Sequence, residues 1–129
     1  ILKKLDAIQG TPLRLYNANT ATLLDTLQAG AAGYSGVMAN FHPELYVWLC
    51  RNFASQPETA KYLADFLTLA SFIEHKPYPV NAKYNLQLVG IGNTLMTRTR
   101  PASDLNETNR SEVRQLKELS DAIAHKLGL

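Results

Sequence analysis

Residues 13–40, LRLYNANTATLLDTLQAGAAGYSGVMAN, contain the pattern that decides the fold of this chain. Leu13–Tyr16 predicts a short strand, and Tyr34–Ala39 is rich in small and apolar residues, as strands covered on both faces tend to be. Between the two lies an apolar face at helical spacing, formed by Leu23, Leu24 and Leu27. A strand, a helix and a strand within about thirty residues form a βαβ unit, which implies parallel pairing with a right-handed crossover.

The rest of the chain is predicted to be helical. Gly10 and Thr11-Pro12 end a first helix, a shorter helix is expected around Val80 to Leu88, and Thr97 to Pro101 is expected to be extended. Three longer helices are indicated by apolar stripes: Leu45, Trp48, Leu49 and Phe53; then Leu63, Phe66, Ala70 and Ile73; and finally Val113, Leu116, Leu119, Ile123 and Leu127. Two parallel strands rarely form a stable sheet alone. We therefore expect further strands upstream, and the chain is predicted not to fold by itself.

Composition excludes several classes of function. Hydrophobic residues make up 46% of the sequence and charged residues 19%, which suits a packed core and not a disordered chain. The net charge of +2 is too small to indicate a nucleic acid as partner. No apolar run is long enough to span a bilayer, the first ten residues do not resemble a signal peptide, and Cys50 is the single cysteine. We therefore expect a cytoplasmic protein that has no membrane partner.

The segment 13–40 resembles the seventh and eighth βα units of the dihydrodipicolinate synthase/N-acetylneuraminate lyase family. The matching pieces are Leu15-Tyr16-Asn17, Leu24, Gly30-Ala31-Ala32-Gly33 and Ala39-Asn40. Further along, the family's Pro-x-Pro-x-x-x-Lys segment is similar to Pro77-Tyr78-Pro79-Val80-Asn81-Ala82-Lys83, and its C-terminal extension is similar to Thr99-Arg100-Pro101 with the final helix. The resemblance therefore covers nearly the whole chain.

The fold that this resemblance implies is α/β, the C-terminal portion of a (β/α)8 TIM barrel. Residues 1–54 would supply the last βα units with the last two parallel strands. Residues 55–129 would form a C-terminal helical extension of the same domain. A doubly wound, flavodoxin-like domain is the structural alternative, and it would require the strand order to reverse instead of closing.

The activity that the resemblance implies is that of a class I aldolase or lyase. Family members bind pyruvate, or a 2-keto acid that yields it, as a Schiff base on a lysine at the end of strand six, and a tyrosine on strand five moves protons. The iminium acts as the electron sink, so neither a metal nor an organic cofactor is needed. The implied partners are a 2-keto acid, an aldehyde, the N-terminal remainder of the barrel and further copies in a homo-oligomer. By this resemblance neither the lysine nor the tyrosine lies in this chain, which alone is expected to be inactive.

Barrel enzymes place their chemistry at the C-terminal ends of the strands, so the site is expected there. Carried over by position, the family's strand-seven glycine falls on Ala18 and the acidic position of the synthases falls on Asn19, directly after Asn17. The strand-eight residue whose main chain approaches pyruvate falls on Ser35, next to Gly36. Small residues at 18 and 36 leave room for a ligand, and Asn19 offers both a donor and an acceptor.

Departures from the family's pattern bear on the substrate. Sialate lyases hold sugar hydroxyls with acidic residues where this chain has Thr20 and Ala21, and their strand-eight serine aligns with Val37. These differences argue against N-acetylneuraminate. The loss of the glycine at Ala18 and of the acidic residue at Asn19 argues in the same way against dihydrodipicolinate synthesis.

Several residues with chemical potential are interpreted as structural. His42, His75 and His125 are far apart, with no cysteine or carboxylate at ligand spacing, so no metal site is expected. Cys50 lies in a predicted helix and is interpreted as a buried, inert thiol. Lys3 and Lys4 are interpreted as the solvated face of a helix. Gly90-Ile91-Gly92 is interpreted as a turn and not a dinucleotide-binding loop, because no strand precedes it, and the arginines at 98, 100 and 110 as dispersed surface residues and not an anion site.

Two hypotheses about function follow. In the first, the complete protein is a Schiff-base aldolase or lyase, and this chain supplies strands seven and eight with the helical extension. In the second, a family member has lost catalysis and serves as a binding or regulatory protein. Whether a strand-terminal lysine lies just upstream of Ile1 would distinguish them. Asn17 and Asn19 also have a simpler interpretation, as turn and N-cap residues.

Overall fold

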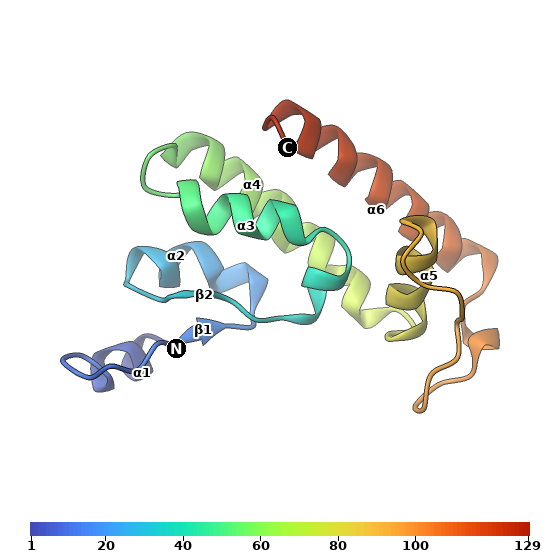
Figure 1. The fold of residues 1–129 in the computed structure, drawn as a ribbon, viewed down its shortest axis with the longest axis horizontal. Coiled ribbons are helices and arrows are strands. Elements are labelled where there is room, and N and C mark those ends of the chain that lie inside the picture. The colour runs from blue at the N-terminus through green and yellow to red at the C-terminus, as the bar shows by residue number, and fades with distance from the viewer. The chain divides into compact units, whose positions relative to one another are not determined.

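The computed structural model describes residues 1–129 as a mostly helical α/β chain with one parallel pair of strands (Figure 1). The residues fall into two units. The first contains Ile1–Ala39 and Leu45–Ser71, and the second contains Asn40–Glu44 and Phe72–Leu129.

The two strands of the first unit are short. β1 (Tyr16–Asn17) pairs in parallel with β2 (Gly33–Tyr34), the first residue of each strand opposite the first residue of the other. The pairing continues beyond the strands, because the Ala32 N–H donates to the carbonyl oxygen of Leu15 at 2.8 Å. The predicted parallel pairing of these two segments is therefore confirmed.

The predicted bounds of the strands were wrong. The second strand was expected to continue to Ala39, but a 3₁₀-helix, η2 (Val37–Asn40), follows β2 after two residues, and the Ala39 N–H donates to the carbonyl of Gly36 at 3.2 Å. The first strand was expected from Leu13, which is instead exposed and lies outside β1. Short apolar runs have no period that separates a strand from a helical turn, so the sequence could not locate these ends.

Helices pack around this sheet. The chain opens with α1 (Leu2–Ala7), and the strands are connected by the 3₁₀-helix η1 (Thr20–Thr22) and by α2 (Leu23–Gln28). Two residues of the predicted face of α2, Leu23 and Leu27, are buried, while Leu24 is half-buried. Gly30 follows α2 with a φ of 99°, a conformation that suits glycine and ends the helix.

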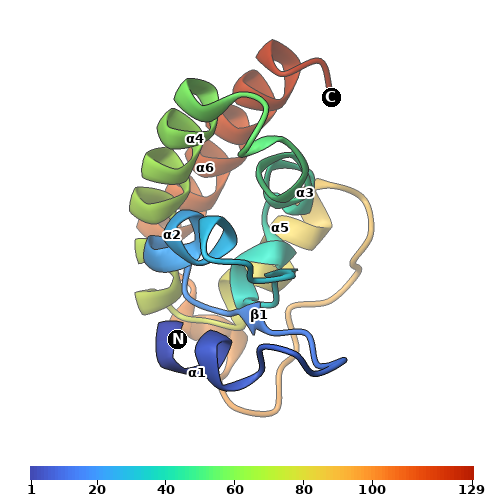
Figure 2. The ribbon, with the colours of Figure 1, turned by 90° about the vertical axis from the view of Figure 1, so that its left-hand side faces the viewer.

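Two longer helices complete the first unit: α3 (Pro43–Asn52), which belongs to it from Leu45 on, and α4 (Pro57–Ala70). α2 packs against α4, and the two lie side by side in Figure 2. The predicted stripe of α3 is buried at Leu45, Trp48 and Leu49. The predicted stripe of α4 was partly wrong, since the helix ends before Ile73 and its buried residues are Ala60, Leu63, Ala64 and Leu67.

The second unit is built on α5 (Val80–Leu88) packed against the long α6 (Glu107–Lys126), with the 3₁₀-helices η3 (Ser71–His75) and η4 (Ala102–Asp104) beside them in sequence. No strand forms where residues 97–101 were expected to be extended. None of the helices combines the length and the apolar composition that a membrane-spanning segment needs.

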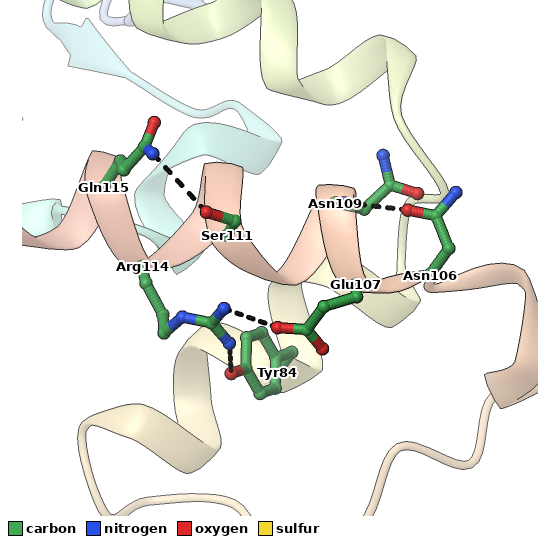
Figure 3. Close-up of polar contacts among 7 residues, drawn as sticks. All are labelled: Tyr84, Asn106, Glu107, Asn109, Ser111, Arg114 and Gln115. Atoms are coloured by element: carbon green, nitrogen blue, oxygen red, sulfur yellow. Dashed lines mark hydrogen bonds and ion pairs between the residues drawn. The ribbon is translucent and has the colours of Figure 1, made fainter.

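Side chains fix both the start of α6 and its contact with α5, as Figure 3 shows. The Asn106 side chain accepts a hydrogen bond from the Asn109 N–H at 2.9 Å and caps the helix. Arg114 donates to the Tyr84 hydroxyl of α5 at 2.8 Å and to Glu107 at 2.6 Å.

Buried polar side chains hold the segment 40–44 within the second unit. Asn85 of α5 donates to the carbonyl oxygens of Asn40 and Phe41 at 3.1 and 3.3 Å. His42, which is fully buried, is hydrogen-bonded through Nδ1 to the Ser120 hydroxyl of α6 at 2.9 Å. Ser120 itself is buried on α6. Leu119, which the sequence predicted to face the core, is 57% exposed, so that prediction was wrong.

The exposure pattern of α4 gives a test of the packing. Leu67 is fully buried and Leu69, on the same helix, is 68% exposed. We expect Leu67→Ala to lower the free energy of unfolding by about 2 to 5 kcal/mol, because it leaves a cavity, and Leu69→Ala to change it by less than about 0.5 kcal/mol. Urea unfolding of the complete protein measures both values, and equal losses would show that α4 is packed on a different face.

His42 predicts a pH dependence of stability. Burial lowers the pKa of His42 from 6.5 to about 4. His42 therefore binds its proton more tightly in the unfolded chain than in the folded one. The contribution of the neutral, buried His42 to the free energy of unfolding is complete above pH 6.5 and is lost as the pH falls from 6.5 towards 4. The loss at this site is about 3 kcal/mol at most.

We expect urea unfolding at a series of pH values to show a weaker dependence over this range in His42→Asn than in the wild-type protein. His125→Asn is the matched control, because His125 is exposed on α6 and should leave the dependence unchanged. If the free energy of unfolding of His42→Asn depends on pH as steeply as that of the wild-type protein, the pH dependence does not come from His42.

Candidate functional site

The structure brings the predicted site residues together at one edge of the sheet. Ala18 and Asn19 directly follow β1, and Ser35 and Gly36 directly follow β2. The Ser35 N–H donates to the carbonyl oxygen of Asn17 at 2.9 Å, so the two chain segments are still paired where the strands end. Since the strands are parallel, both carboxyl ends lie at the same edge, where parallel α/β folds place their ligands.

The register separates these residues into two faces. Asn17 lies opposite Tyr34 in the register, so their side chains share a face of the sheet. That face is the one towards α2, because Asn17 Nδ2 donates to Thr26 Oγ1 of that helix at 2.9 Å. Side chains alternate along a strand, which directs Ala18 and Ser35 to the opposite face, and both are exposed.

The side chain of Asn17 is fully engaged in local structure. It is buried, and Nδ2 donates to Thr22 Oγ1 at 3.0 Å as well as to Thr26. Its Oδ1 accepts from the Asn19 N–H at 2.9 Å. The turn interpretation of Asn17 therefore describes its side chain, which leaves its main chain as the part that can face a ligand.

Asn19 differs from Asn17 in being exposed. It occupies the N-cap position of η1, as the sequence suggested, but its side chain does not cap that helix. Its amide thus lies at the edge of the sheet without a role in the helix start. Among the predicted residues, Asn19 and Ser35 carry the polar side chains that are open to solvent.

Gly36 has a packing reason for lacking a side chain. An ideal β-carbon there would overlap the hydroxyl of Tyr34 and lie 2.6 Å from the carbonyl oxygen of Ala18. The expectation that a small residue at 36 leaves room for a ligand is therefore corrected. The space beside Gly36 is filled by the neighbouring strand end and by a tyrosine.

Three hydroxyl groups that the sequence analysis did not connect meet behind this edge. Thr20 Oγ1 lies 2.8 Å from the hydroxyl of Tyr46 and 3.2 Å from that of Tyr34, within hydrogen-bonding distance of both. The two tyrosine rings are stacked, with centroids 3.9 Å apart and planes 6° from parallel. Tyr34 belongs to β2, Thr20 to η1 and Tyr46 to α3, so no single spacing in the sequence indicates the cluster.

Cys50, Lys3 and Lys4 do not add polar side chains to this edge of the sheet. Cys50 is half-buried, and burial raises the pKa of its thiol, partly offset by a main-chain hydrogen bond with Tyr34. The thiol was expected to be buried and is only half-buried, while the raised pKa favours its protonated form, which is the poorer nucleophile. Lys3 and Lys4 are exposed on α1, as expected for a solvated face.

Two of the three arginines that the sequence analysis singled out have partners. Arg100 lies 3.6 Å from Asp104, and Arg110 lies over the Tyr84 ring at 4.8 Å from its centroid. No three His, Cys, Asp or Glu side chains come together in a way that could hold a metal ion.

Comparison with known proteins identifies the family. The chain matches the model of the Dihydrodipicolinate synthetase family over residues 2–119, and it therefore belongs to this family. The family is one of pyruvate-dependent aldolases and lyases of class I, built on the TIM barrel. The two parallel strands and the helices around them are compatible with that architecture. No curated protein and no solved structure matches the chain.

The close packing at Gly36 predicts a structural cost for any side chain there. We expect Gly36→Ala to lower the free energy of unfolding by about 2 to 3 kcal/mol, because the new methyl group meets a main-chain oxygen that cannot move independently. Ser35→Ala, at the exposed neighbouring position, should change it by less than about 0.5 kcal/mol. Urea unfolding of the complete protein measures both, and a fully stable Gly36→Ala would show that the space is open.

Proposed function

We propose that this chain supplies strands seven and eight of a (β/α)8 barrel that acts as a Schiff-base, pyruvate-dependent aldolase or lyase on a 2-keto acid. Residues 1–54 would be the last βα units, and residues 55–129 the helical extension of the same domain. The observation that carries this proposal is the parallel pairing of β1 with β2 in a chain of this family, with Ala18 and Ser35 at the common carboxyl edge.

The geometry of the sheet supports the barrel. In the order β1–β2 each strand has one neighbour only, and the face that carries Ala18 and Ser35 has exposed side chains. Parallel sheets occur almost always with several strands and with both faces covered. Further strands of an N-terminal remainder would pair with these edges, and a barrel interior would cover the exposed face.

The chemistry proposed for the complete site needs an amine that this chain is not proposed to supply. A lysine nitrogen adds to the keto carbon of the substrate and water leaves, which gives an iminium. The iminium accepts the electron pair when the neighbouring carbon loses a proton or its bond to the aldehyde-derived carbon breaks, and the enamine so formed donates that pair when the bond is made. The role proposed for this chain is binding. Ala18, Asn19 and Ser35, with the main chain of Asn17 and of Gly36, would line the mouth, and the Asn19 amide offers a donor and an acceptor.

The remaining proposals follow from the family. The second substrate would be an aldehyde, and the complete protein would be a cytoplasmic homo-oligomer that needs no cofactor. The alternative, a family member without catalysis that binds a ligand or regulates a partner, makes a different prediction for the trapping experiment below, because it requires no reactive lysine.

Borohydride trapping tests the proposal. In the complete protein, pyruvate should form an iminium that sodium borohydride reduces to a stable adduct on one lysine. Peptide mass spectrometry locates that lysine. Residues 1–129 alone should give no adduct under the same conditions. Borohydride without pyruvate is the control for non-specific reduction.

Two outcomes would contradict parts of this proposal. If the complete protein gives no adduct, the Schiff-base function is wrong and the non-catalytic alternative is favoured. If the adduct falls on a lysine of residues 1–129, the chain itself carries the nucleophile and the assignment of strands seven and eight is wrong.

A further inference from the structure

The hydroxyl cluster of Thr20, Tyr34 and Tyr46 joins three elements directly behind the candidate site. Thr20 is 5% exposed and Tyr46 is 3% exposed, so the centre of the cluster is shielded from water. Hydrogen bonds are stronger where water is excluded, and leaving one of their groups without a partner there costs more. The cluster therefore holds its three elements in one arrangement.

The geometry of the two rings indicates that the threonine is needed. Aromatic pairs prefer offset or edge-to-face arrangements with larger centroid separations. Here the rings are nearly parallel and their centroids are only 3.9 Å apart. Both hydroxyl groups lie within hydrogen-bonding distance of the same atom, Thr20 Oγ1, which brings the two rings into register.

The Tyr34 hydroxyl also contacts the site's main chain. It occupies the place that a β-carbon on Gly36 would take, and the carbonyl oxygen of Ala18 borders the same place. One end of Tyr34 thus lies against Gly36, close to where the carbonyl of Ala18 meets the same residue, while Thr20 follows Ala18 and Asn19 directly in the chain. A shift of this hydroxyl would move the main chain at 18–20 and at 35–36 together.

We propose that Tyr34 is a positioning residue for the 2-keto acid, whose hydroxyl, held by Thr20, sets the main-chain geometry at Ala18, Ser35 and Gly36. This inference rests on the proposed function and adds to it a residue on the helix-covered face of the sheet. Tyr34 acts through the main chain and does not touch the ligand. Its effect should therefore appear in the binding of the 2-keto acid more than in the rate of the reaction.

The test is borohydride trapping in the complete protein at increasing pyruvate concentration. Tyr34→Phe removes the hydroxyl and keeps the ring, and Thr20→Val removes the shared partner at similar volume. Each should raise the pyruvate concentration for half-maximal trapping roughly threefold to tenfold, the factor that one hydrogen bond supplies. Tyr62→Phe is the matched control, because Tyr62 is exposed on α4, and its titration should equal that of the wild-type protein.

A double variant separates positioning from general loosening. If Tyr34 and Thr20 act through one hydrogen bond, Tyr34→Phe with Thr20→Val should shift the half-maximal concentration no more than the larger single change. A purely structural role predicts less folded protein, and so a lower maximal amount of adduct, with the same half-maximal concentration. Thermal unfolding of each variant measures the folded fraction independently.

The outcomes distinguish this inference from the function on which it rests. Trapping in the wild-type protein with an unchanged half-maximal concentration in Tyr34→Phe and Thr20→Val overturns the positioning role and leaves the Schiff-base function intact. If Tyr34→Phe does not fold, Thr20→Val alone decides. No trapping in the wild-type protein overturns both proposals, since there is then no bound 2-keto acid to position.

Discussion

The side chain of Asn17 joins the first strand to the two helical segments that follow it, η1 and α2. Its Oδ1 fixes the turn at Asn19, and its Nδ2 binds Thr22 of η1 and Thr26 of α2. Because the amide is buried and both of its ends are bonded, β1 cannot shift relative to α2 without leaving polar groups unsatisfied. This side chain thus fixes the place of β1 against η1 and α2, while main-chain hydrogen bonds from Ala32 to Leu15 and from Ser35 to Asn17 hold its register with β2.

The second unit uses buried polar side chains in the same way. Asn85 binds the carbonyl oxygens of residues 40 and 41, Asn81 binds that of Ile73 at 2.9 Å, and His42 is bonded to Ser120. Each of these bonds gives an irregular segment a defined place against a helix, which apolar packing alone would not specify. The bonds of Asn81 and Asn85 also give partners to main-chain carbonyl groups, and the bond of His42 gives one to a buried hydroxyl.

The two faces of the small sheet differ in how closely they are packed. On the face towards α2, the side chains of Asn17 and Tyr34 are packed against other protein atoms, and such atoms also fill the space beside Gly36. The other face carries Ala18 and Ser35, which are exposed. An arrangement of this kind allows a closely packed face to control the geometry of a site that opens on the other, because the strand main chain is shared by both.

The sequence by itself determined the βαβ unit and its parallel pairing, and through its resemblance the family, but it did not locate the ends of the strands. The βαβ unit and its pairing follow from local periodicity and residue order, which a linear pattern records, whereas the family follows from the resemblance of the motifs in residues 13–40 and 77–83. Only the tertiary structure decided that Asn17 faces α2, that Gly36 is small for packing, that Ser120 replaces Leu119 in the core, and that Thr20 meets two tyrosines. Each of these depends on which residues from distant segments become neighbours, and small or polar residues give no periodic signal of burial.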